Sequence, residues 1–412
     1  METRRIGFQT DALLAPEQAV TLYFAHAQLR APKTEYVPLE HALRRVLAES
    51  IVSEASYPAA ARSAMDGFAL RSADTPGRLA IAGEIRMGRA WSGTLQERTA
   101  LRIPTGGVVP DGADAVVPVE DVNLDGESVE ISTAVPPGDS VTPAGCDMRP
   151  GETLLEPGRR VGPAELGVLA TLGIAGVAVY RRPVVAVISS GDELVDIGSQ
   201  PSIAQVRDSN RWAVAGTLEA LGAAVRHLPI APDDPARLEA LLREALATCD
   251  AVVLTGGSSV GDRDFTPRII GQLGKPGVIV HGLRVKPGKP TVLAAIGGKP
   301  VIGLPGNPAS ALLILEAVAA PIIAWLSGRR VRAAVAQAKL DAPVRKRPGW
   351  TWFVPVRVDE AAGAPVAYPL ELRSSSVSLL ARASGFLILD ETIESVPAGA
   401  PVAVTRFLVG GY

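Results

Sequence analysis

Strand-like and helix-like segments alternate over residues 183–328, and this alternation constrains the fold more than any other feature of the chain. Val184-Val-Ala-Val-Ile-Ser-Ser is a continuous apolar run, of the kind that a parallel sheet buries on both faces. Helical spacing follows after Asp208 and again from about Pro235. Repeated βα units of these lengths predict a three-layer α/β sheet with right-handed crossovers. A long helix is expected from Pro308, and further strands are expected at 225–230, 251–255, 278–285, 291–296 and 300–304.

Helical and β-rich regions flank this α/β segment. Residues 1–50 indicate one helix after Pro16 and a second over 37–48, and a helical pattern returns at 163–172. Between them, Asp-Gly and Pro-Gly turns separate short Val/Ile runs, which is typical of a small β domain. Alternating runs near the C-terminus predict a β-barrel or sandwich, and they lie at 350–358, 386–389 and 401–405. The predicted domains are a helical or linker domain I of 1–50 and 151–182, an inserted β-rich domain II of 51–150, an α/β domain III of 183–335 and a C-terminal domain IV of 336–412.

The charge balance limits the kinds of partner that the chain can have. Its 412 residues include 41 Lys and Arg against 43 Asp and Glu, a formal net charge of -2. This balance gives no reason to expect nucleic acid or an anionic membrane as the main partner. An anionic ligand must therefore be held by a few placed groups and not by a basic surface.

Cysteine content and targeting signals indicate a soluble cytoplasmic protein. Cys146 and Cys249 are compatible with one disulfide or two free thiols, and free thiols in a reducing cytosol fit better. No CxxC or HExxH motif is present, so the sequence carries no signature of structural zinc or an iron–sulfur cluster. The N-terminus lacks the apolar core of a signal peptide. The most apolar run, 309–326, is interrupted by Glu316 and Pro321 and is better explained as a buried helix than as a membrane span.

Unusual loops follow three strands of the predicted α/β domain, where ligands bind in open α/β sheets. They are Ser190-Gly-Asp-Glu-Leu, Thr255-Gly-Gly-Ser-Ser-Val-Gly-Asp-Arg-Asp and Gly303-Leu-Pro-Gly-Asn-Pro-Ala-Ser. Each loop places glycine where backbone N–H groups could face an anion. Asn307 can cap the last helix, and Pro308 fits its first position, which would direct free N–H groups and a positive dipole end at the pocket.

A basic turn, Lys286-Pro-Gly-Lys-Pro, lies between these loops. Two lysines beside several acidic residues suit a phosphorylated ligand, neutralised partly by lysine and partly by carboxylate-bound Mg²⁺. No GxxxxGK[ST] phosphate loop exists, and no GxGxxG opens the helix after the first strand. The chain is therefore neither an ordinary ATPase nor a dinucleotide dehydrogenase.

Most of these residues, taken one at a time, have ordinary structural interpretations. A Gly-Gly pair after a strand is usually structural, the two lysines would be solvated, and Asp66 would be a turn residue. The segment Asp233-Asp-Pro has the spacing of an N-cap before a helix. The adjacent Asp192 and Glu193 favour a function, because two carboxylates at a strand end repel each other unless something binds them.

In combination, these segments resemble the molybdopterin molybdenumtransferase (molybdenum insertase) family, which is related to the gephyrin E domain. The resemblance covers essentially the whole chain. Eight segments in register carry it, namely Ser63-Ala-Met-Asp-Gly-Phe-Ala, Pro104-Thr-Gly-Gly with Pro110-Asp-Gly-Ala-Asp-Ala-Val-Val, Gly145-Cys-Asp-Met-Arg-Pro-Gly, Ser189-Ser-Gly-Asp-Glu-Leu, Arg207-Asp-Ser-Asn, Thr255-Gly-Gly-Ser-Ser-Val-Gly-Asp-Arg-Asp, Lys286-Pro-Gly-Lys-Pro and Gly303-Leu-Pro-Gly-Asn-Pro.

The resemblance implies a fold, an assembly and a reaction. The fold would be a multidomain α/β protein with a three-layer molybdopterin-binding domain, small β-rich domains and a C-terminal β-barrel. The assembly would be an elongated homodimer whose active cleft is shared between subunits. The reaction would insert molybdate into adenylylated molybdopterin, with Mg²⁺ as cofactor and AMP as product. The implied protein partners are a molybdopterin adenylyltransferase and apo-molybdoenzymes.

The resemblance also carries roles onto individual positions. The catalytic residues would be Asp66, Thr105, Asp147, Glu193, Asp233 and Asp264. Glu193 and Asp264 would also be the metal ligands. The residues expected to bind the pterin nucleotide and the oxyanion are Gly191, Asp192, Gly256, Gly257, Ser258, Ser259, Lys286, Lys289, Pro305, Asn307 and Pro308.

Two positions depart from the family pattern. The usual Phe-x-Arg strand of the C-terminal domain is Phe353-Val-Pro355 here, so an arginine associated with the molybdate site is missing. The usual Asn-Gly near the end of that domain is Ser384-Gly385. Arg357 and Arg373 are candidates to replace the missing guanidinium.

Two alternative functions fit part of the pattern. A molybdopterin adenylyltransferase shares the α/β domain and its Gly-Gly loop, but that activity needs only one compact domain. A non-catalytic pterin-binding or scaffold paralogue is disfavoured by the retention of every matched acid and mildly favoured by the missing arginine. Turnover separates these alternatives from the molybdenum insertase.

Overall fold

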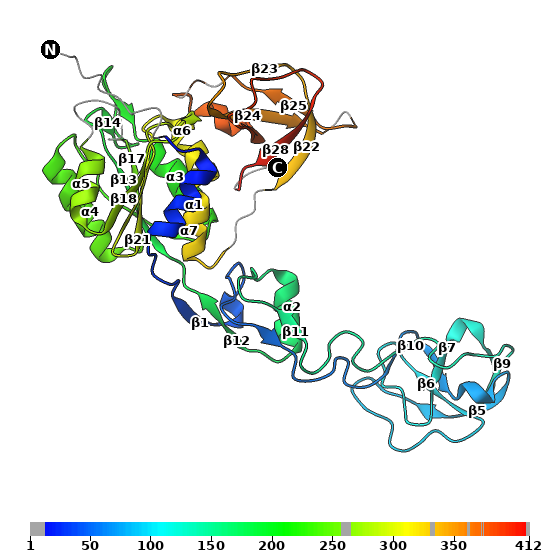
Figure 1. Ribbon diagram of the computed structural model, residues 1–412. Coiled ribbons are helices and arrows are strands. Elements are labelled where there is room, and N and C mark those ends of the chain that lie inside the picture. The colour runs from blue at the N-terminus through cyan, green and yellow to red at the C-terminus, as the bar shows by residue number, and fades with distance from the viewer. Residues whose placement is uncertain are drawn as a thin grey trace, which may run out of the picture. The chain divides into compact units, whose positions relative to one another are not determined.

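The computed structural model of the chain describes residues 13–256, 265–329, 334–360, 363–371, 373 and 375–408 (Figure 1). The chain separates into two compact units. Unit 1 comprises Met1–Ala48, Gly158–Leu166 and Ala175–Tyr412, and unit 2 comprises Glu49–Pro157 and Gly167–Ile174. The four predicted domains and their boundaries remain a proposal.

A six-stranded sheet forms the centre of the α/β part of unit 1. Its four parallel strands adjoin two antiparallel ones at one edge. From β13 the chain moves first to β16 on one side and then to β17 on the other, which creates a topological switch point between β13 and β17. The strand order is β16 (Ala224–His227), β13 (Val184–Ser189), β17 (Ala251–Thr255), β21 (Lys299–Leu304), β20 (Val292–Ile296) and β18 (Pro276–His281).

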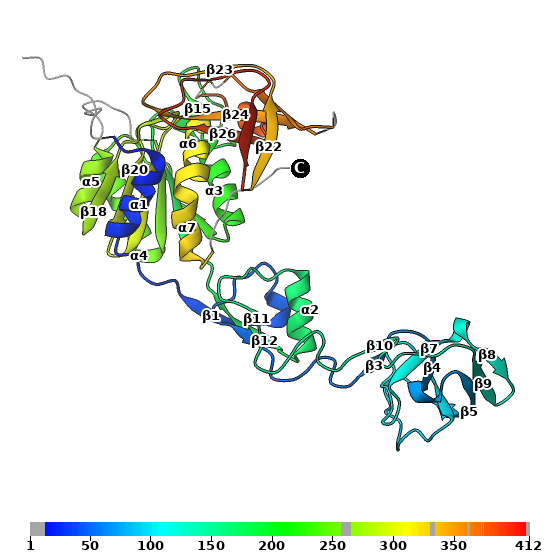
Figure 2. The same cartoon turned by 45° about the vertical axis from the view of Figure 1, so that its right-hand side comes forward.

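Helices cover both faces of this sheet, which confirms the predicted three-layer architecture. Figure 2 shows α1, α3 and α7 on one face and α4 and α5 on the other. Apolar residues of the strands and of the covering helices interlock in two clusters, one on each face. The helices are α1 (Pro16–His26), α3 (Asn210–Ala220), α6 (Pro308–Ile314), η5 (Leu315–Ala319) and α7 (Ala320–Leu326) on the first face, and α4 (Pro235–Thr248) and α5 (Thr266–Leu273) on the second.

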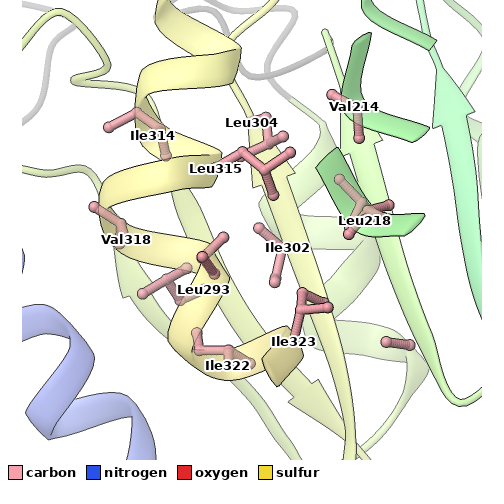
Figure 3. Close-up of a cluster of buried hydrophobic side chains, with 14 of the residues drawn as sticks. Val214, Leu218, Leu293, Ile302, Leu304, Ile314, Leu315, Val318, Ile322 and Ile323 are labelled. Atoms are coloured by element: carbon pink, nitrogen blue, oxygen red, sulfur yellow. The ribbon is translucent and has the colours of Figure 1, made fainter. Parts of the chain in front are cut away.

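The most apolar helix of the chain is a core helix. Among the described residues one helix, Pro308–Leu326, is long and apolar enough to cross a membrane, but 72% of its most apolar window is buried. Figure 3 shows Leu315 of this helix pointing toward the strands and α3, while Ile314 and Val318 lie on its other side and belong to the same buried cluster. The helix is apolar on nearly all sides because the sheet, the neighbouring helices and the C-terminal barrel enclose it. The predicted buried helix is confirmed.

The C-terminal part of unit 1 is a closed barrel, which decides between the predicted barrel and sandwich. Five strands pair in the cyclic order β24, β25, β22, β28 and β26, and β26 pairs again with β24. The chain also contributes β19 (Val285–Lys286) from the α/β part as a parallel neighbour of β24. The barrel strands are β22 (Val335–Leu340), β24 (Thr351–Asp359), β25 (Val366–Pro369), β26 (Gly385–Leu389) and β28 (Pro401–Arg406), accompanied by the pair β23 (Val344–Arg345) and β27 (Ser395–Val396) and by α8 (Ser378–Arg382).

Unit 2 is built mainly of short strands, as its turn-rich sequence predicts. A six-stranded sheet has the order β7, β4, β6, β5, β9 and β8, and Phe68, Leu79 and Val129 lie in its buried core. The strands are β4 (Gly67–Leu70), β5 (Gly77–Glu84), β6 (Thr99–Ile103), β7 (Ala115–Pro118), β8 (Asn123–Asp125) and β9 (Ser128–Ile131), with the smaller pairs β2 (Ile51–Val52) and β11 (Thr153–Leu155), and β3 (Arg62–Ser63) and β10 (Val141–Thr142).

The predicted second helix over 37–48 is wrong. This segment begins inside β1 (Thr34–Pro38), which pairs in antiparallel register with β12 (Gly176–Tyr180), and only the short 3-10 turn η2 (Leu39–His41) follows. Arg44 has a φ of 64°, which ends any helical continuation. A pairing with a strand far away in the sequence therefore overrode the local apolar spacing. The other helix expected nearby is confirmed as α2 (Pro163–Thr171).

The predicted strand over 278–285 is also wrong at its C-terminal end. It ends at His281 because Gly282 turns the chain at a φ of 88°. Val285 then belongs to β19 and pairs with the barrel instead of the α/β sheet. This turn is important for the site, since it carries the basic loop from the sheet to the barrel.

Candidate active site

A cavity of about 1610 Å³ lies at the carboxyl ends of β13, β17 and β21. The loops after these strands form one part of its wall, and the N-terminal ends of α3 and α6 form another. The barrel contributes Arg347, Trp350, Trp352, Ser375 and Val377. The cavity thus occupies the position at which open α/β sheets bind ligands, next to the switch point between β13 and β17.

Ten of the predicted site residues line this one cavity. They come from five separate segments of the sequence, and only the fold brings them together. These residues are Gly191, Asp192, Glu193, Asp233, Gly256, Lys286, Lys289, Pro305, Asn307 and Pro308. Gly257, Ser258, Ser259 and Asp264 lie outside the described residues.

Carboxylates form the acidic side of the cavity. Asp192 accepts a hydrogen bond at Oδ1 from the Asp233 backbone N–H at 3.0 Å, which joins the loops that follow β13 and β16. Asp234, and not Asp233, caps helix α4, because its Oδ1 accepts from the backbone N–H groups of Ala236 and Arg237. The Asp233 side chain therefore lines the cavity and does not cap the helix, so the N-cap interpretation does not apply to it.

Gly191 and Gly256, the described glycines of the first two loops, use their own N–H groups in backbone hydrogen bonds. The Gly191 N–H donates to the Ala231 carbonyl, and the Gly256 N–H donates to the Leu304 carbonyl. Gly256 has a φ of 85°, and a Cβ there would lie 2.2 Å from the Ser190 carbonyl oxygen. The expectation that the amides of these two glycines face an anion is wrong, because both N–H groups already donate to backbone carbonyls.

The N-terminus of α6 faces the cavity, but without the predicted side-chain cap. Asn307 occupies the N-cap position and Pro308 the first turn, yet the Asn307 side chain makes no capping hydrogen bond. The amide of Asn210, at the start of α3, donates instead to the Gly306 carbonyl at 2.6 Å. This bond fixes the loop after β21 against α3 and leaves the Asn307 side chain on the cavity wall.

Two lysines and two tryptophans form the basic side of the cavity. The Lys286 Nζ lies 4.3 Å from the centroid of the Trp352 ring, and the Lys289 Nζ lies 5.9 Å from the centroid of the Trp350 ring. Both distances fall within the range of cation–π attraction. The turn between the lysines is tightly packed, since a Cβ at Gly288 would lie 2.3 Å from the Ile314 side chain. Both ammonium groups are therefore held on the cavity wall by aromatic rings of the barrel.

Sequence reasoning missed several residues of the cavity. Asp208 is 2% exposed, and its Oδ2 has no hydrogen-bond partner among the described residues, while Oδ1 accepts from the Arg211 N–H. Ser190 Oγ is buried and likewise without a partner. Asp208 lies in the Arg207-Asp-Ser-Asn segment, so its signal was present in the sequence. Arg347 and the two tryptophans gave no such signal, because only the docking of the barrel brings them to the cavity.

Three predicted catalytic residues lie in unit 2. The backbone N–H and the hydroxyl of Thr105 both donate to Asp66 Oδ1, at 2.6 and 2.9 Å. These two bonds stabilise the ionised carboxylate and hold the pKa of Asp66 below its ordinary value. Asp147 is exposed, and its backbone N–H donates to the Tyr57 carbonyl. Asp66 is therefore an exposed carboxylate that is ionised at neutral pH.

The positions that depart from the family pattern do not border the cavity. Pro355 is buried in β24, where its carbonyl accepts from the Leu370 N–H. The Arg357 guanidinium stacks over Tyr368 at 4.4 Å, and Arg373 lies 3.9 Å from Glu371. Neither arginine lines the cavity. The barrel instead contributes a different guanidinium, that of Arg347.

The fold and the site together define a class of protein, a multidomain α/β protein with a large ligand cavity, lined in part by charged residues, beside a closed barrel. Family models match nearly the whole chain. Residues 14–173 match the MoeA N-terminal region (domain I and II), 186–325 the probable molybdopterin binding domain, and 337–407 the MoeA C-terminal region (domain IV). The chain belongs to the molybdopterin molybdenumtransferase family, a family of transferases of molybdenum cofactor biosynthesis.

Individual relatives agree with this assignment. The molybdopterin molybdenumtransferase of Haemophilus influenzae is 33% identical over 91% of this chain and 94% of its own length. That of Bacillus subtilis is 35% identical over 90% and 89%, and molybdopterin molybdenumtransferase 2 of Mycobacterium tuberculosis is 36% identical over 91% and 96%. A solved molybdopterin biosynthesis MoeA protein of Pyrococcus horikosii has a TM-score of 0.81 at 33% identity, covering 97% of this chain and 100% of that chain.

Proposed function

We propose that this chain inserts molybdate into adenylylated molybdopterin and releases AMP. Family membership supports this reaction, and the observation that carries it is one cavity lined by both carboxylates and lysines. A ligand that combines a pterin, phosphates and a nucleotide needs a large cavity with placed cations, and molybdate needs cations for its two negative charges. The volume of about 1610 Å³ leaves room for both substrates.

The reaction assigns distinct tasks to the two sides of the cavity. Hydrolysis of the phosphoanhydride takes up one water and yields AMP and the pterin phosphate. Each molybdate oxygen that the dithiolene sulfurs replace leaves as water after taking up two protons. We assign binding and charge neutralisation of the anions to Lys286 and Lys289, and positioning of the attacking water to Glu193 and Asp233.

Mg²⁺ fits the chemistry of the carboxylate side. Carboxylate oxygens are the protein ligands that Mg²⁺ prefers, and it commonly binds one or two of them together with substrate phosphates. Among the described residues no group of three or more His, Cys, Asp or Glu could hold a metal ion. Glu193 and Asp264 are the proposed ligands, and the bound metal would neutralise phosphate charge.

The remaining parts of the proposal follow from the family resemblance. We infer that the enzyme is a cytoplasmic homodimer with a shared cleft, and that Asp66, Thr105 and Asp147 act in the reaction. The expected protein partners are a molybdopterin adenylyltransferase as supplier and apo-molybdoenzymes as recipients. A sedimentation measurement that finds only monomers at micromolar concentration would remove the dimer from this proposal.

Turnover tests the proposed reaction. The purified chain would be mixed with adenylylated molybdopterin, molybdate and Mg²⁺, while AMP release and activation of a cofactor-free molybdoenzyme are followed. We expect both signals, and we expect Glu193→Ala to abolish both. Glu219→Ala is the matched control, because Glu219 is exposed on α3 and does not line the cavity. Tight pterin binding without either signal in the unmodified chain would identify a binding protein instead of an enzyme.

A further inference from the structure

The barrel presents a braced turn, residues 346–350, to the cavity. The backbone N–H groups of Lys346 and Gly349 donate to the carbonyls of Glu394 and Glu391, each at 2.9 Å. The Lys346 side chain is buried, and its Nζ donates to the Trp350 carbonyl at 2.8 Å. Three hydrogen bonds thus fix this turn, so the side chains that it carries have a defined place on the wall.

Arg347 is the charged residue that this turn carries into the cavity wall. Its side chain is exposed, and among the described residues it makes no ion pair or hydrogen bond. Arg207, another arginine of the wall, differs in this respect, because its Nε donates to the carbonyls of Ile197 and Ser199. Arg347 is therefore a guanidinium whose donors are all available to a ligand.

The two lysines line the same cavity as Arg347. Trp350, whose ring lies under Lys289, is three residues from Arg347 in the same turn. Trp352, whose ring lies under Lys286, follows in β24. The carboxylates of the cavity come from other segments, the loops after β13 and β16 and the start of α3. The cavity wall therefore carries three cations, Lys286 and Lys289 from the basic turn and Arg347 from the barrel, that come from other segments than its carboxylates.

We propose that Arg347 is the third cation of an oxyanion subsite and binds molybdate together with Lys286 and Lys289. A tetrahedral dianion suits this set, because a guanidinium binds two oxygens with its planar fork while each ammonium acts as a point charge. The phosphates of the nucleotide offer the same chemistry, but the subsite is assigned to free molybdate. This inference rests on the proposed function and adds to it a specificity residue in the chain's own barrel.

Direct binding of molybdate tests the subsite without any pterin. Titration calorimetry and tryptophan fluorescence would be recorded for the unmodified chain, Arg347→Ala, Arg347→Lys and Arg345→Ala. The control Arg345 is exposed in β23, two residues away, and does not line the cavity. Since a charge-assisted hydrogen bond contributes about 1.5–3 kcal/mol, we expect Arg347→Ala to weaken molybdate binding roughly tenfold or more. Arg347→Lys should recover part of the loss, and Arg345→Ala should change the affinity less than about twofold.

A measurement of AMP affinity distinguishes molybdate from a nucleotide phosphate as the ligand of the subsite. If Arg347 binds molybdate, Arg347→Ala leaves the AMP affinity unchanged. Loss of AMP affinity with intact molybdate affinity would overturn the assignment, and so would equal losses for both ligands. Absence of molybdate binding by the unmodified chain, in the presence and absence of AMP, would overturn it as well. Unchanged thermal unfolding of each variant ensures that a loss of binding is not a loss of folding.

Steady-state kinetics separate this inference from the proposed function. We expect Arg347→Ala to raise the KM for molybdate about tenfold or more while kcat at saturating molybdate changes little, since the residue acts in binding. Turnover by the unmodified chain with an unchanged KM in Arg347→Ala would overturn the subsite and leave the function. Molybdate binding that depends on Arg347, without AMP release by the unmodified chain, would leave the subsite and overturn the function.

Discussion

The Lys286 ammonium lies 4.3 Å from the centroid of the Trp352 ring, and the two residues are direct partners in the β19–β24 pairing. Lys286 belongs to the α/β part of unit 1 and Trp352 to the barrel. The junction is reinforced by an ion pair of 2.7 Å between Arg284 and Glu391 and by a hydrogen bond from the Thr351 N–H to the Arg284 carbonyl. The barrel therefore sets the position of a cation at the ligand cavity.

Removing the aromatic ring should weaken anion binding although the lysine remains. A cation–π contact contributes about 0.5–2 kcal/mol, so we expect Trp352→Ala to lower molybdate affinity by roughly twofold to thirtyfold. Trp352→Phe should have a smaller effect, because a phenyl ring retains part of the attraction. Titration calorimetry measures both. Equal affinities of the alanine variant and the unmodified chain would show that the ring does not position Lys286.

Asp208→Asn should separate ligand binding from stability. The substituted side chain can still accept the bond from the Arg211 N–H, but it removes the buried carboxylate whose Oδ2 has no hydrogen-bond partner among the residues that the structure describes. Because an unpaired buried charge costs free energy, we expect the midpoint of thermal unfolding to stay constant or rise. AMP affinity or pterin affinity should fall about tenfold, the usual scale for loss of a charged hydrogen-bond acceptor. If the variant bound both ligands normally, Asp208 would be a structural residue only.

The stability of unit 1 should depend on pH through Glu316. Burial raises the pKa of this carboxyl from 4.5 to about 7, although its carboxylate accepts a hydrogen bond from the Leu408 N–H. The folded state then binds the proton more tightly than the unfolded chain. The free energy of unfolding should therefore fall as the pH rises from about 4.5 to about 7, by up to about 3 kcal/mol, and change little from this residue above that range.

Glu316→Gln provides the comparison for this pH dependence. Glutamine keeps an acceptor for the Leu408 N–H but does not titrate. Urea unfolding of both proteins at pH 5 and pH 7.5 would measure the difference, and we expect the loss of stability between these pH values to be smaller in the variant by the contribution of Glu316. Parallel pH profiles of the two proteins would contradict the assignment.

Gly256→Ala should destabilise unit 1. The added Cβ would meet the Ser190 carbonyl oxygen at 2.2 Å, and a φ of 85° is unfavourable for alanine by about 1–2 kcal/mol before the clash is counted. Gly216→Ala is the control, since Gly216 lies in α3 with nothing within 4 Å of the added atom. That control should be neutral or stabilising by up to about 1 kcal/mol. Thermal unfolding that ranks the two variants in the opposite order would show that the loop adapts.

Local patterns in the sequence determined the α/β sheet and the buried helix. The strand Ala251–Thr255 was predicted at its observed bounds, because a short, mostly apolar run between Asp250 and Gly256 fits a buried strand and is too short for a helix. The helix from Pro308 was predicted as a buried helix because its run is strongly apolar but is interrupted by Glu316 and Pro321. Glycine-rich loops after three strands predicted the position of the cavity, because open α/β sheets bind ligands at the carboxyl ends of their strands.

Tertiary structure alone decided what depends on pairing between distant segments. The segment 37–48 has helical spacing, but Val37 pairs with Val177 in a strand whose partner lies about 140 positions away in the sequence. The contacts of Lys286 with Trp352 and the place of Arg347 on the wall depend on docking of the barrel, which no local pattern encodes. The sequence by itself thus determined most helices and strands of the α/β part and the acidic residues at the strand ends. The reason is that the spacing of apolar residues within one helix or strand is a local property of the sequence. Only the tertiary structure decided which aromatic and cationic side chains from distant segments lie together at the cavity, because their positions depend on how the barrel packs against the α/β part.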